Sequence, residues 1–292
     1  MKLMILFRLL VCIVLVIGIV APFTFLEPKT IVVVVKAPAE PVVVVIAPKV
    51  VKKVKVIEKP LHQVKLPDFS SINDIPTKKR KFFNFIRPAV EAKNKQLLED
   101  RNKLEYWQGQ ISLGLGLVEA EQAELQALIK AYRINEQAST LQQINDLLER
   151  VDVIPTSLVL VQAANESAWG TSRFARIGLN FFGIWCYKKG CGMVPGGRDT
   201  GAKHEVAAFK SVDTSISGYF NNINKHNAYH VFRTIRAELR AQNQPLNPEI
   251  LATGLLPYSQ RGTQYVLDIS DMLRHNQRYF VKENNQNISS TH

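Results

Sequence analysis

Apolar residues follow three patterns along the chain. A continuous apolar run extends from Leu9 to Ala21, and further apolar residues carry it to Leu26. Residues 27–80 combine valine-rich stretches with prolines and lysines, a composition typical of an extended, solvated linker. Beyond residue 80, apolar residues recur at three- and four-residue steps, which predicts amphipathic helices.

The leading apolar run follows the cationic residues Lys2 and Arg8. This arrangement is typical of a secretion signal, and the run is about long enough to span a bilayer as a helix. No pair of small residues suited to cleavage precedes Pro22. We therefore expect residues 1–26 to form an uncleaved signal anchor, with a cleaved signal peptide as the alternative, and the rest of the chain to lie outside the cytoplasm.

Helical spacing marks two segments, Val90–Trp107 and Leu117–Tyr132, and a third apolar stripe over residues 141–148. We expect these segments to form an accessory bundle over residues 81–150. Pro155 stands at a position where a helix tolerates proline well, and it begins a further, largely apolar helix.

A short helix expected over residues 171–178 is followed by two strand-like segments, residues 180–185 and 205–209, with a glycine-rich loop between them. This pattern predicts a small β-hairpin. Cys186 and Cys191 lie in this region, and their spacing suits a short disulfide loop in an oxidising compartment. A metal site would need two further soft ligands nearby, so we favour the disulfide.

Glu166 is a carboxylate in the last turn of the apolar helix that begins at Pro155, next to Trp169. Burial disfavours the carboxylate anion, and the C-terminus of a helix repels negative charge. Both effects raise the pKa of the side chain, as a general acid working near neutral pH requires. The alternative is a structural carboxylate that caps the helix or pairs with Arg173 or Arg176.

The chain of 292 residues has a net charge of +12, and this charge is unevenly distributed. Residues 1–81 contain 14 of the 37 Lys and Arg residues but 5 of the 25 Asp and Glu residues, so the remainder is nearly neutral. Nucleic acid is therefore not an expected partner. A basic tail beside a membrane segment suits anionic lipid or an anionic wall polymer better.

Two other kinds of site have less support. His226 and His230 are four residues apart in an expected helix, a spacing that can hold zinc, but the residues between them lack the glutamate of a metalloprotease helix. No serine or cysteine has a nucleophile-elbow pattern. We therefore expect neither a metal nor another cofactor.

Two motifs carry a resemblance to a known family: residues 163–170, Ala-Ala-Asn-Glu-Ser-Ala-Trp-Gly, and residues 180–184, Asn-Phe-Phe-Gly-Ile. They are similar to the signature of the bacterial N-acetylglucosaminidases of glycoside hydrolase family 73, which include the glucosaminidase domain of the flagellar peptidoglycan hydrolase. The likeness is closest to the Bax-type branch. It covers about residues 145–280 and continues through Tyr219 and residues 258–265.

The resemblance implies an α+β, mainly helical, lysozyme-like domain that cuts the glycan strand of peptidoglycan at N-acetylglucosamine. By position, it implies that Glu166 is the catalytic acid and Tyr258 the active-site tyrosine. Aromatic side chains beside the acid suit the apolar faces of sugar rings. The expected substrate-binding residues are Trp169, Phe182, Trp185 and Asn180. For at least two of Phe181, Phe182 and Phe209, however, a place in the core is the better expectation.

Two residues are candidates for the second catalytic carboxylate. Many relatives have a glutamate shortly before a hairpin glycine, where this chain has Gly197 and Arg198. Asp199 and Glu205 are the nearest carboxylates, and we rank them equally. Closely spaced carboxylates indicate a covalent intermediate, and a wider pair indicates an activated water. In a third route the acetamido oxygen of the substrate attacks, with Tyr258 positioning the amide, and the sequence leaves all three routes open.

Four parts are therefore expected: a signal anchor or signal peptide at residues 1–26, a linker at 27–80, accessory helices at 81–150 and a glucosaminidase domain at 151–292. The expected partners are the glycan strand and, through the N-terminal helix, the inner membrane. With this anchor, the domain is expected to lie in the periplasm; if the signal is cleaved, the protein is expected to be secreted. Two alternatives remain: a non-catalytic, membrane-tethered wall-binding scaffold, and a lytic transglycosylase, which also uses a single glutamate.

Overall fold

The computed structural model describes residues 59–198 and 201–280. The N-terminal apolar run and most of the linker lie outside these residues, so the expected anchor stays a prediction. Within the described ranges, no helix combines the length and the apolar composition needed to cross a membrane.

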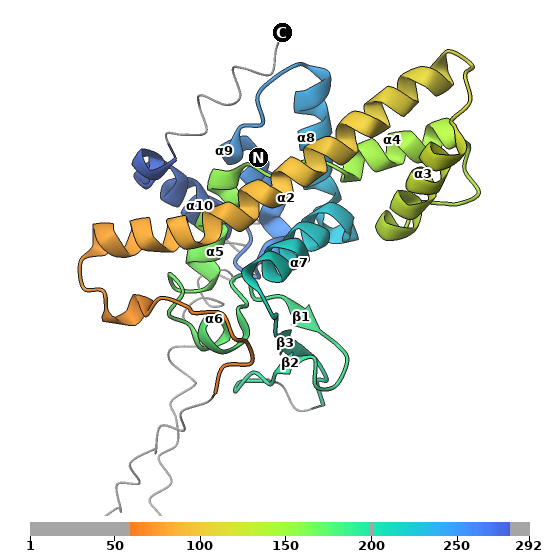
Figure 1. Cartoon of the computed structure of the whole chain (residues 1–292). Helices are drawn as coiled ribbons and strands as arrows, with labels where there is room; N and C mark the ends of the chain where they lie inside the picture. The colour runs from red at the N-terminus through yellow and green to blue at the C-terminus, as the bar shows by residue number, and fades with distance from the viewer. Residues whose placement is uncertain (1–58, 199–200, 281–292) are drawn as a thin grey trace, which may run out of the picture. The chain divides into compact units, whose positions relative to one another are not determined.

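The described residues are mainly helical, and they also contain a small sheet (Figure 1). The α-helices are α2 (Ile75–Ser112), α3 (Glu119–Tyr132), α4 (Thr140–Arg150), α5 (Thr156–Glu166), α6 (Arg173–Gly178), α7 (Val212–Lys225), α8 (His230–Ala241), α9 (Pro248–Ala252) and α10 (Thr263–His275). The strands are β1 (Trp185–Cys186), β2 (Gly192–Met193) and β3 (Glu205–Ala207). Short 3-10 helices are η1 (Phe69–Ser71), η2 (Asn227–Tyr229), η3 (Thr253–Tyr258) and η4 (Gln277–Tyr279). The mainly helical α+β class with a small sheet is therefore confirmed.

Helix α2 is a long helix that runs past several others (Figure 1). Asp74 caps its first turn by accepting the N–H of Thr77 (2.9 Å), and Pro88 lies inside it. The helix extends beyond the predicted segment, Val90–Trp107, in both directions. It packs against α4, α5 and α7, and its buried side chains join one continuous core with theirs. The expected accessory helices thus share a core with the residues that follow, while the domain bounds stay a prediction.

Local sequence signals place several helix ends. Ser139 caps α4 by accepting the N–H of Gln142 (3.3 Å), and Ser172 caps α6 by accepting the N–H of Ala175 (3.2 Å). The helices predicted over residues 117–132 and 171–178 are confirmed, with bounds shifted by about two residues, as α3 and α6.

The sheet is antiparallel, with strand order β1-β3-β2. Its residue pairs include Trp185 with Val206 and Gly192 with Ala207. The strand predicted over residues 180–185 is wrong except at its last residue. Asn180 accepts the N–H of Ile184 (3.0 Å) and donates to the carbonyls of Ile184 and Ala207 (2.9 Å each). These bonds close a turn at residues that the aromatic pattern assigned to a strand.

A buried ion cluster joins α2 and α8 around Asp152, which is 1% exposed. Its carboxylate lies 3.4 Å from Arg101, 2.8 Å from Arg240 and 3.8 Å from the buried Arg236. Burial disfavours the Asp152 anion, but the three guanidinium groups outweigh burial and hold its pKa below the usual range. Burial lowers the pKa of Arg236 to about 10, so this arginine depends on its counter-ion.

Candidate active site

Glu166 is the last residue of α5, a helix that is otherwise almost entirely buried. The chain reverses immediately afterwards, because Ala168 and Trp169 adopt left-handed backbone conformations with φ of 50° and 58°. The Ser167 hydroxyl stabilises this turn by donating to a carbonyl in the last turn of α5 (2.6 Å) and accepting the N–H of Gly170 (2.8 Å). The turn leaves the Glu166 side chain half-buried.

Helix α2 packs against this turn. The ring of Trp169 contacts those of Phe82 and Phe83, with centroids 5.8 and 5.2 Å apart. The ammonium group of Lys79 lies 5.2 Å from the centroid of the same indole ring. Trp169 therefore joins α2 to the turn after the acid, and its expected contact with a substrate stays a prediction.

Burial raises the pKa of Glu166 above its usual value. Hydrogen bonds with the Asn165 amide (3.1 Å) and the Tyr265 hydroxyl act in the opposite direction, as does the charge of Arg261, but they do not cancel the effect of burial. Glu166 therefore keeps its proton to a higher pH than a solvent-exposed glutamate. This property is the one that a general acid needs.

Tyrosines from four elements gather around Glu166. They are Tyr219 of α7, Tyr229 of η2, Tyr258 of η3 and Tyr265 of α10. Burial raises the pKa of each phenol, and the charge of Glu166 raises it further. All four therefore stay neutral and keep a proton to donate. Tyr258 donates to the carbonyl of Phe182 (2.9 Å), and its ring stacks on Tyr265 with centroids 5.4 Å apart.

Tyr229 and Tyr265 are not among the functional residues that the sequence predicts, and Gln162 is not a predicted partner of the site. Gln162 donates to the hydroxyl of Tyr265 (2.8 Å) across a sequence separation of 103 residues. The available signal was its four-residue spacing from Glu166, which places both side chains on one face of α5. That signal could not identify α10 as the helix facing them.

Three expected substrate-binding residues have different environments. Asn180 is 1% exposed, and its side-chain amide hydrogen-bonds with backbone groups. Phe182 is 3% exposed, and its ring stacks on that of Tyr219 with centroids 4.2 Å apart. Both side chains thus belong to the interior. Trp185 is 55% exposed and stacks on His204 at 4.2 Å, so it presents a free aromatic surface. Substrate contact stays a prediction for each of them.

Glu205, a candidate second carboxylate, is bound to the hairpin. Its two carboxylate oxygens accept the N–H groups of Gly190 and Gly192, at 2.9 Å each. These bonds lower the pKa of Glu205, so it is ionised at neutral pH. The other candidate, Asp199, lies outside the described residues. The structure thus shows what Glu205 does for the fold, and the catalytic assignments of both residues stay predictions.

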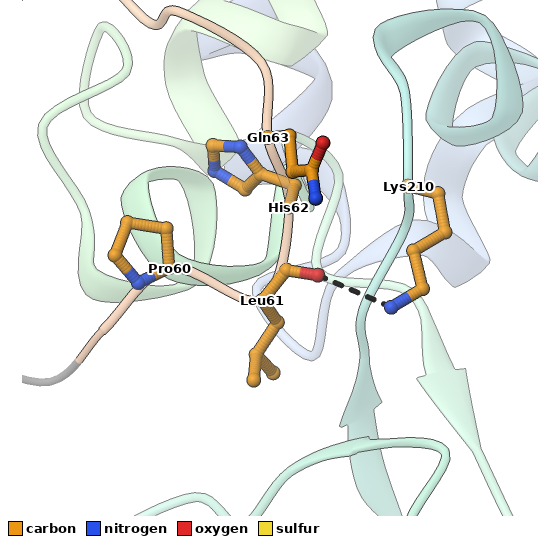
Figure 2. Close-up of a pocket in the computed structure, with 5 residues that line it drawn as sticks. All are labelled: Pro60, Leu61, His62, Gln63 and Lys210. Atoms are coloured by element: carbon orange, nitrogen blue, oxygen red, sulfur yellow. Dashed lines mark hydrogen bonds between the residues drawn. The ribbon is translucent and has the colours of Figure 1, made fainter.

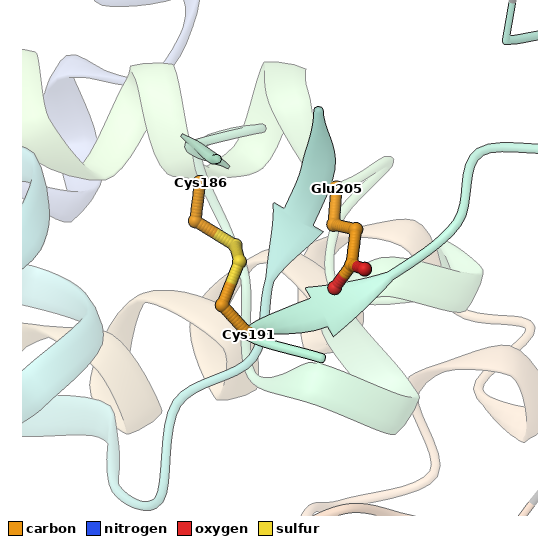
Figure 3. Close-up of side chains that lie close together, drawn as sticks. All are labelled: Cys186, Cys191 and Glu205. Atoms are coloured by element: carbon orange, nitrogen blue, oxygen red, sulfur yellow. A yellow bond between two sulfur atoms is a disulfide. The ribbon is translucent and has the colours of Figure 1, made fainter. Parts of the chain in front are cut away.

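The Cys186–Cys191 disulfide closes the loop that Glu205 binds (Figure 3), with the two Cα atoms 6.3 Å apart. The two sulfur atoms and the Glu205 carboxylate lie within 4.8 Å of one another, a grouping that could suggest a metal site. Because the sulfurs are bonded to each other, neither is a thiolate that could bind a metal. The expected disulfide is present in the structure.

Replacing both cysteines with serine should lower the free energy of unfolding by about 2 kcal/mol, the loop-entropy contribution expected for so short a loop. Thermal unfolding with and without dithiothreitol tests this. The reductant should lower the Tm of the wild-type protein to that of the variant and leave the variant unchanged. Equal Tm values without reductant would contradict a stabilising role.

The histidine pair expected on one helix is divided between two elements. His226 follows α7 and caps η2 by accepting the N–H of Ala228 (3.2 Å), whereas His230 begins α8. The expectation of a shared helix is therefore wrong, and the four-residue spacing has no helical geometry. The cause is the turn at residues 226–229, which ends α7 before the second histidine.

A pocket lies where the described chain begins, between residues 60–63 and Lys210 (Figure 2). Lys210 donates to the carbonyl of Leu61 (3.3 Å), and the N–H of Leu61 donates to the carbonyl of Ile177 (2.8 Å). These bonds attach Leu61 to α6 and to the segment between β3 and α7. No carboxylate lines this pocket, so it offers no acid for glycoside cleavage.

A half-buried acid surrounded by neutral phenols in an α+β domain has the chemistry of a glycoside hydrolase site. Residues 141–279 match the family model Glucosaminidase, described as mannosyl-glycoprotein endo-beta-N-acetylglucosaminidase. Protein bax of Escherichia coli (strain K12) is 36% identical over 216 residues, which are 73% of this chain and 75% of that protein. The chain therefore belongs to the glucosaminidase family, and its predicted Bax-type likeness is confirmed. No solved structure is significantly similar to it.

Proposed function

We propose that the protein is an endo-β-N-acetylglucosaminidase that cleaves the glycan strand of peptidoglycan, with Glu166 as the general acid. The observation that carries this proposal is the half-buried Glu166 carboxyl, whose pKa is raised by burial, among three buried tyrosines and the half-buried Tyr258. It lies inside the segment matched by the glucosaminidase family, residues 141–279. Membership of the glucosaminidase family supports a glycan that contains N-acetylglucosamine, such as peptidoglycan, as the substrate.

In the proposed mechanism, protonated Glu166 donates its proton to the bridging oxygen while the glycosidic bond breaks. The carboxylate that results is favoured by Arg261 and by the Tyr265 hydroxyl, both of which lower the Glu166 pKa. The proton of Tyr258 is used in its bond to Phe182, so its oxygen is able to accept the acetamido N–H of the substrate. We assign Tyr258 this positioning role.

The engagement of Glu205 with two backbone N–H groups makes it a poor nucleophile or base in this arrangement. Asp199 and the substrate's own acetamido oxygen are the remaining candidates for the second role. We propose in addition that residues 1–26 anchor the protein in the inner membrane with the domain in the periplasm. The apolar run supports this location, and so does the disulfide, which forms in an oxidising compartment.

Product analysis tests the function directly. Purified peptidoglycan is digested, reduced with borohydride and analysed by mass spectrometry. We expect fragments that end in reduced N-acetylglucosamine. Anhydro-sugar ends would instead identify a lytic transglycosylase, and binding to the wall without released fragments would identify a scaffold; either result would overturn the proposal.

A further inference from the structure

A chain of buried polar side chains leads from the core to Glu166. The Tyr219 hydroxyl donates to the Oε1 atom of Gln162, and the Nε2 atom of Gln162 donates to the Tyr265 hydroxyl (2.8 Å). The Tyr265 hydroxyl in turn hydrogen-bonds with Glu166. Gln162 is completely buried and lies one helical turn before Glu166 on α5.

The composition of α5 makes Gln162 exceptional. Its neighbours in the buried part of the helix include Leu158, Val159, Leu160, Val161, Ala163 and Ala164. A buried amide is unfavourable unless its donor and its acceptor are both bonded. An apolar residue would satisfy packing at this place without that requirement. The amide is therefore best explained by what it bonds.

Tyr219 determines the orientation of this amide. Its ring is buried against Phe182, and among the described residues Gln162 is the hydrogen-bond partner of its hydroxyl. A reversed amide would present N–H groups to that hydroxyl and leave the phenolic proton without its acceptor, which is unfavourable in the interior. Gln162 therefore directs its NH₂ group at Tyr265. The Tyr265 oxygen accepts this bond, which leaves its proton for Glu166.

We propose that Gln162 is a positioning residue for the general acid. Acting through Tyr265, it orients the Glu166 carboxyl and supports the carboxylate that forms as the proton leaves. This inference rests on the proposed function and extends it to two residues of the core, Gln162 and Tyr219.

The variant Gln162→Leu keeps the approximate size of the side chain and removes both hydrogen bonds. We expect kcat on a soluble glycan fragment to fall about tenfold with KM nearly unchanged. The basic limb of the pH–rate profile should move to higher pH, because the Glu166 anion loses support. Tyr265→Phe should shift it in the same direction, and the double variant should be no worse than Tyr265→Phe alone, since Gln162 acts through Tyr265.

Tyr219→Phe provides a milder test if Gln162→Leu does not fold, because it keeps the ring stack and removes only the hydroxyl that orders the amide. It should give a smaller shift in the same direction. Gln143→Leu is the matched control: Gln143 is also a buried glutamine, and its side-chain NH₂ group donates to the carbonyls of Asn135 and Glu136 (3.2 and 3.1 Å). It should change stability without moving the pH profile.

A carboxyl NMR titration of Glu166 in the substrate-free protein checks the pKa without using activity. The inference is overturned if Glu166 titrates as in the wild type, and the pH–rate profile is unchanged, in both Gln162→Leu and Tyr219→Phe. A change in KM without a change in kcat would overturn it as well. The proposed function fails separately, when Glu166→Gln keeps its activity. An inactive Glu166→Gln beside a fully active Gln162→Leu would therefore remove only the positioning role.

Discussion

Replacing Glu166 with glutamine should lower the release of reducing ends from purified peptidoglycan by a factor of about 100 or more, because glutamine keeps the shape but has no proton to donate. The fold should survive this change. Burial raises the folded-state pKa of Glu166, so ionising it costs stability as the pH rises from the unfolded-state pKa through the folded one. A neutral glutamine avoids that cost, and the Tm at neutral pH should equal or exceed that of the wild type.

Glu238→Gln, an exposed carboxylate of α8, is the matched control and should leave activity unchanged. Wild-type activity should decline on the basic side as Glu166 loses its proton. A Glu166→Gln protein that retains most of its lytic activity would show that the general acid is another residue.

Replacing Asp152 with asparagine should lower the free energy of unfolding by about 3–5 kcal/mol, since it removes the shared counter-ion of a buried cluster. Arg236 is 0% exposed and would keep its charge in the interior without a carboxylate. Arg101 and Arg240 would lose the same partner. Urea unfolding at neutral pH measures the difference.

The pH dependence of the free energy of unfolding provides a second test of the Asp152 cluster. The folded-state pKa of Asp152 is below its unfolded value, so its contribution is present above the unfolded pKa and is lost as the pH falls through the folded one. In the Asp152→Asn variant, the free energy of unfolding should lack this loss at acidic pH. Glu149→Gln is the control, because Glu149 is 45% exposed and lies 3.6 Å from Arg233; its effect should stay below about 1 kcal/mol. If Asp152→Asn and Glu149→Gln lowered the free energy of unfolding equally, a special role for Asp152 would be contradicted.

Local signals predicted the helices well where the chain has caps and regular apolar spacing. The segments that became α3, α4 and α6 begin close to where their patterns place them. The apolar spacing did not predict the bounds of a helix where tertiary contacts outweigh local preferences. The apolar spacing predicted a helix only from Val90, yet α2 begins at Ile75, and Phe82 and Phe83 in this added part pack against Trp169.

The predicted strand at residues 180–185 failed for a related reason. Its aromatic composition favours strand conformation, but the Asn180 side chain bonds the backbone of its own turn and of β3. Trp185, the end of that segment, does join the sheet. The partner that decides between strand and turn is 27 residues away in the sequence, beyond the range of a local pattern.

By itself, the sequence determined the family, the helix that ends at Glu166 and the burial that raises the pKa of this carboxyl, since motif, periodicity and helix position are local properties. Only the tertiary structure decided which groups surround that acid. Tyr265 and Gln162, 103 residues apart, meet because α10 packs on α5. Asp152 and its arginines meet because α2 and α8 share one core. Such pairings depend on how whole elements pack to bury their apolar faces, and no short stretch of the chain carries that information.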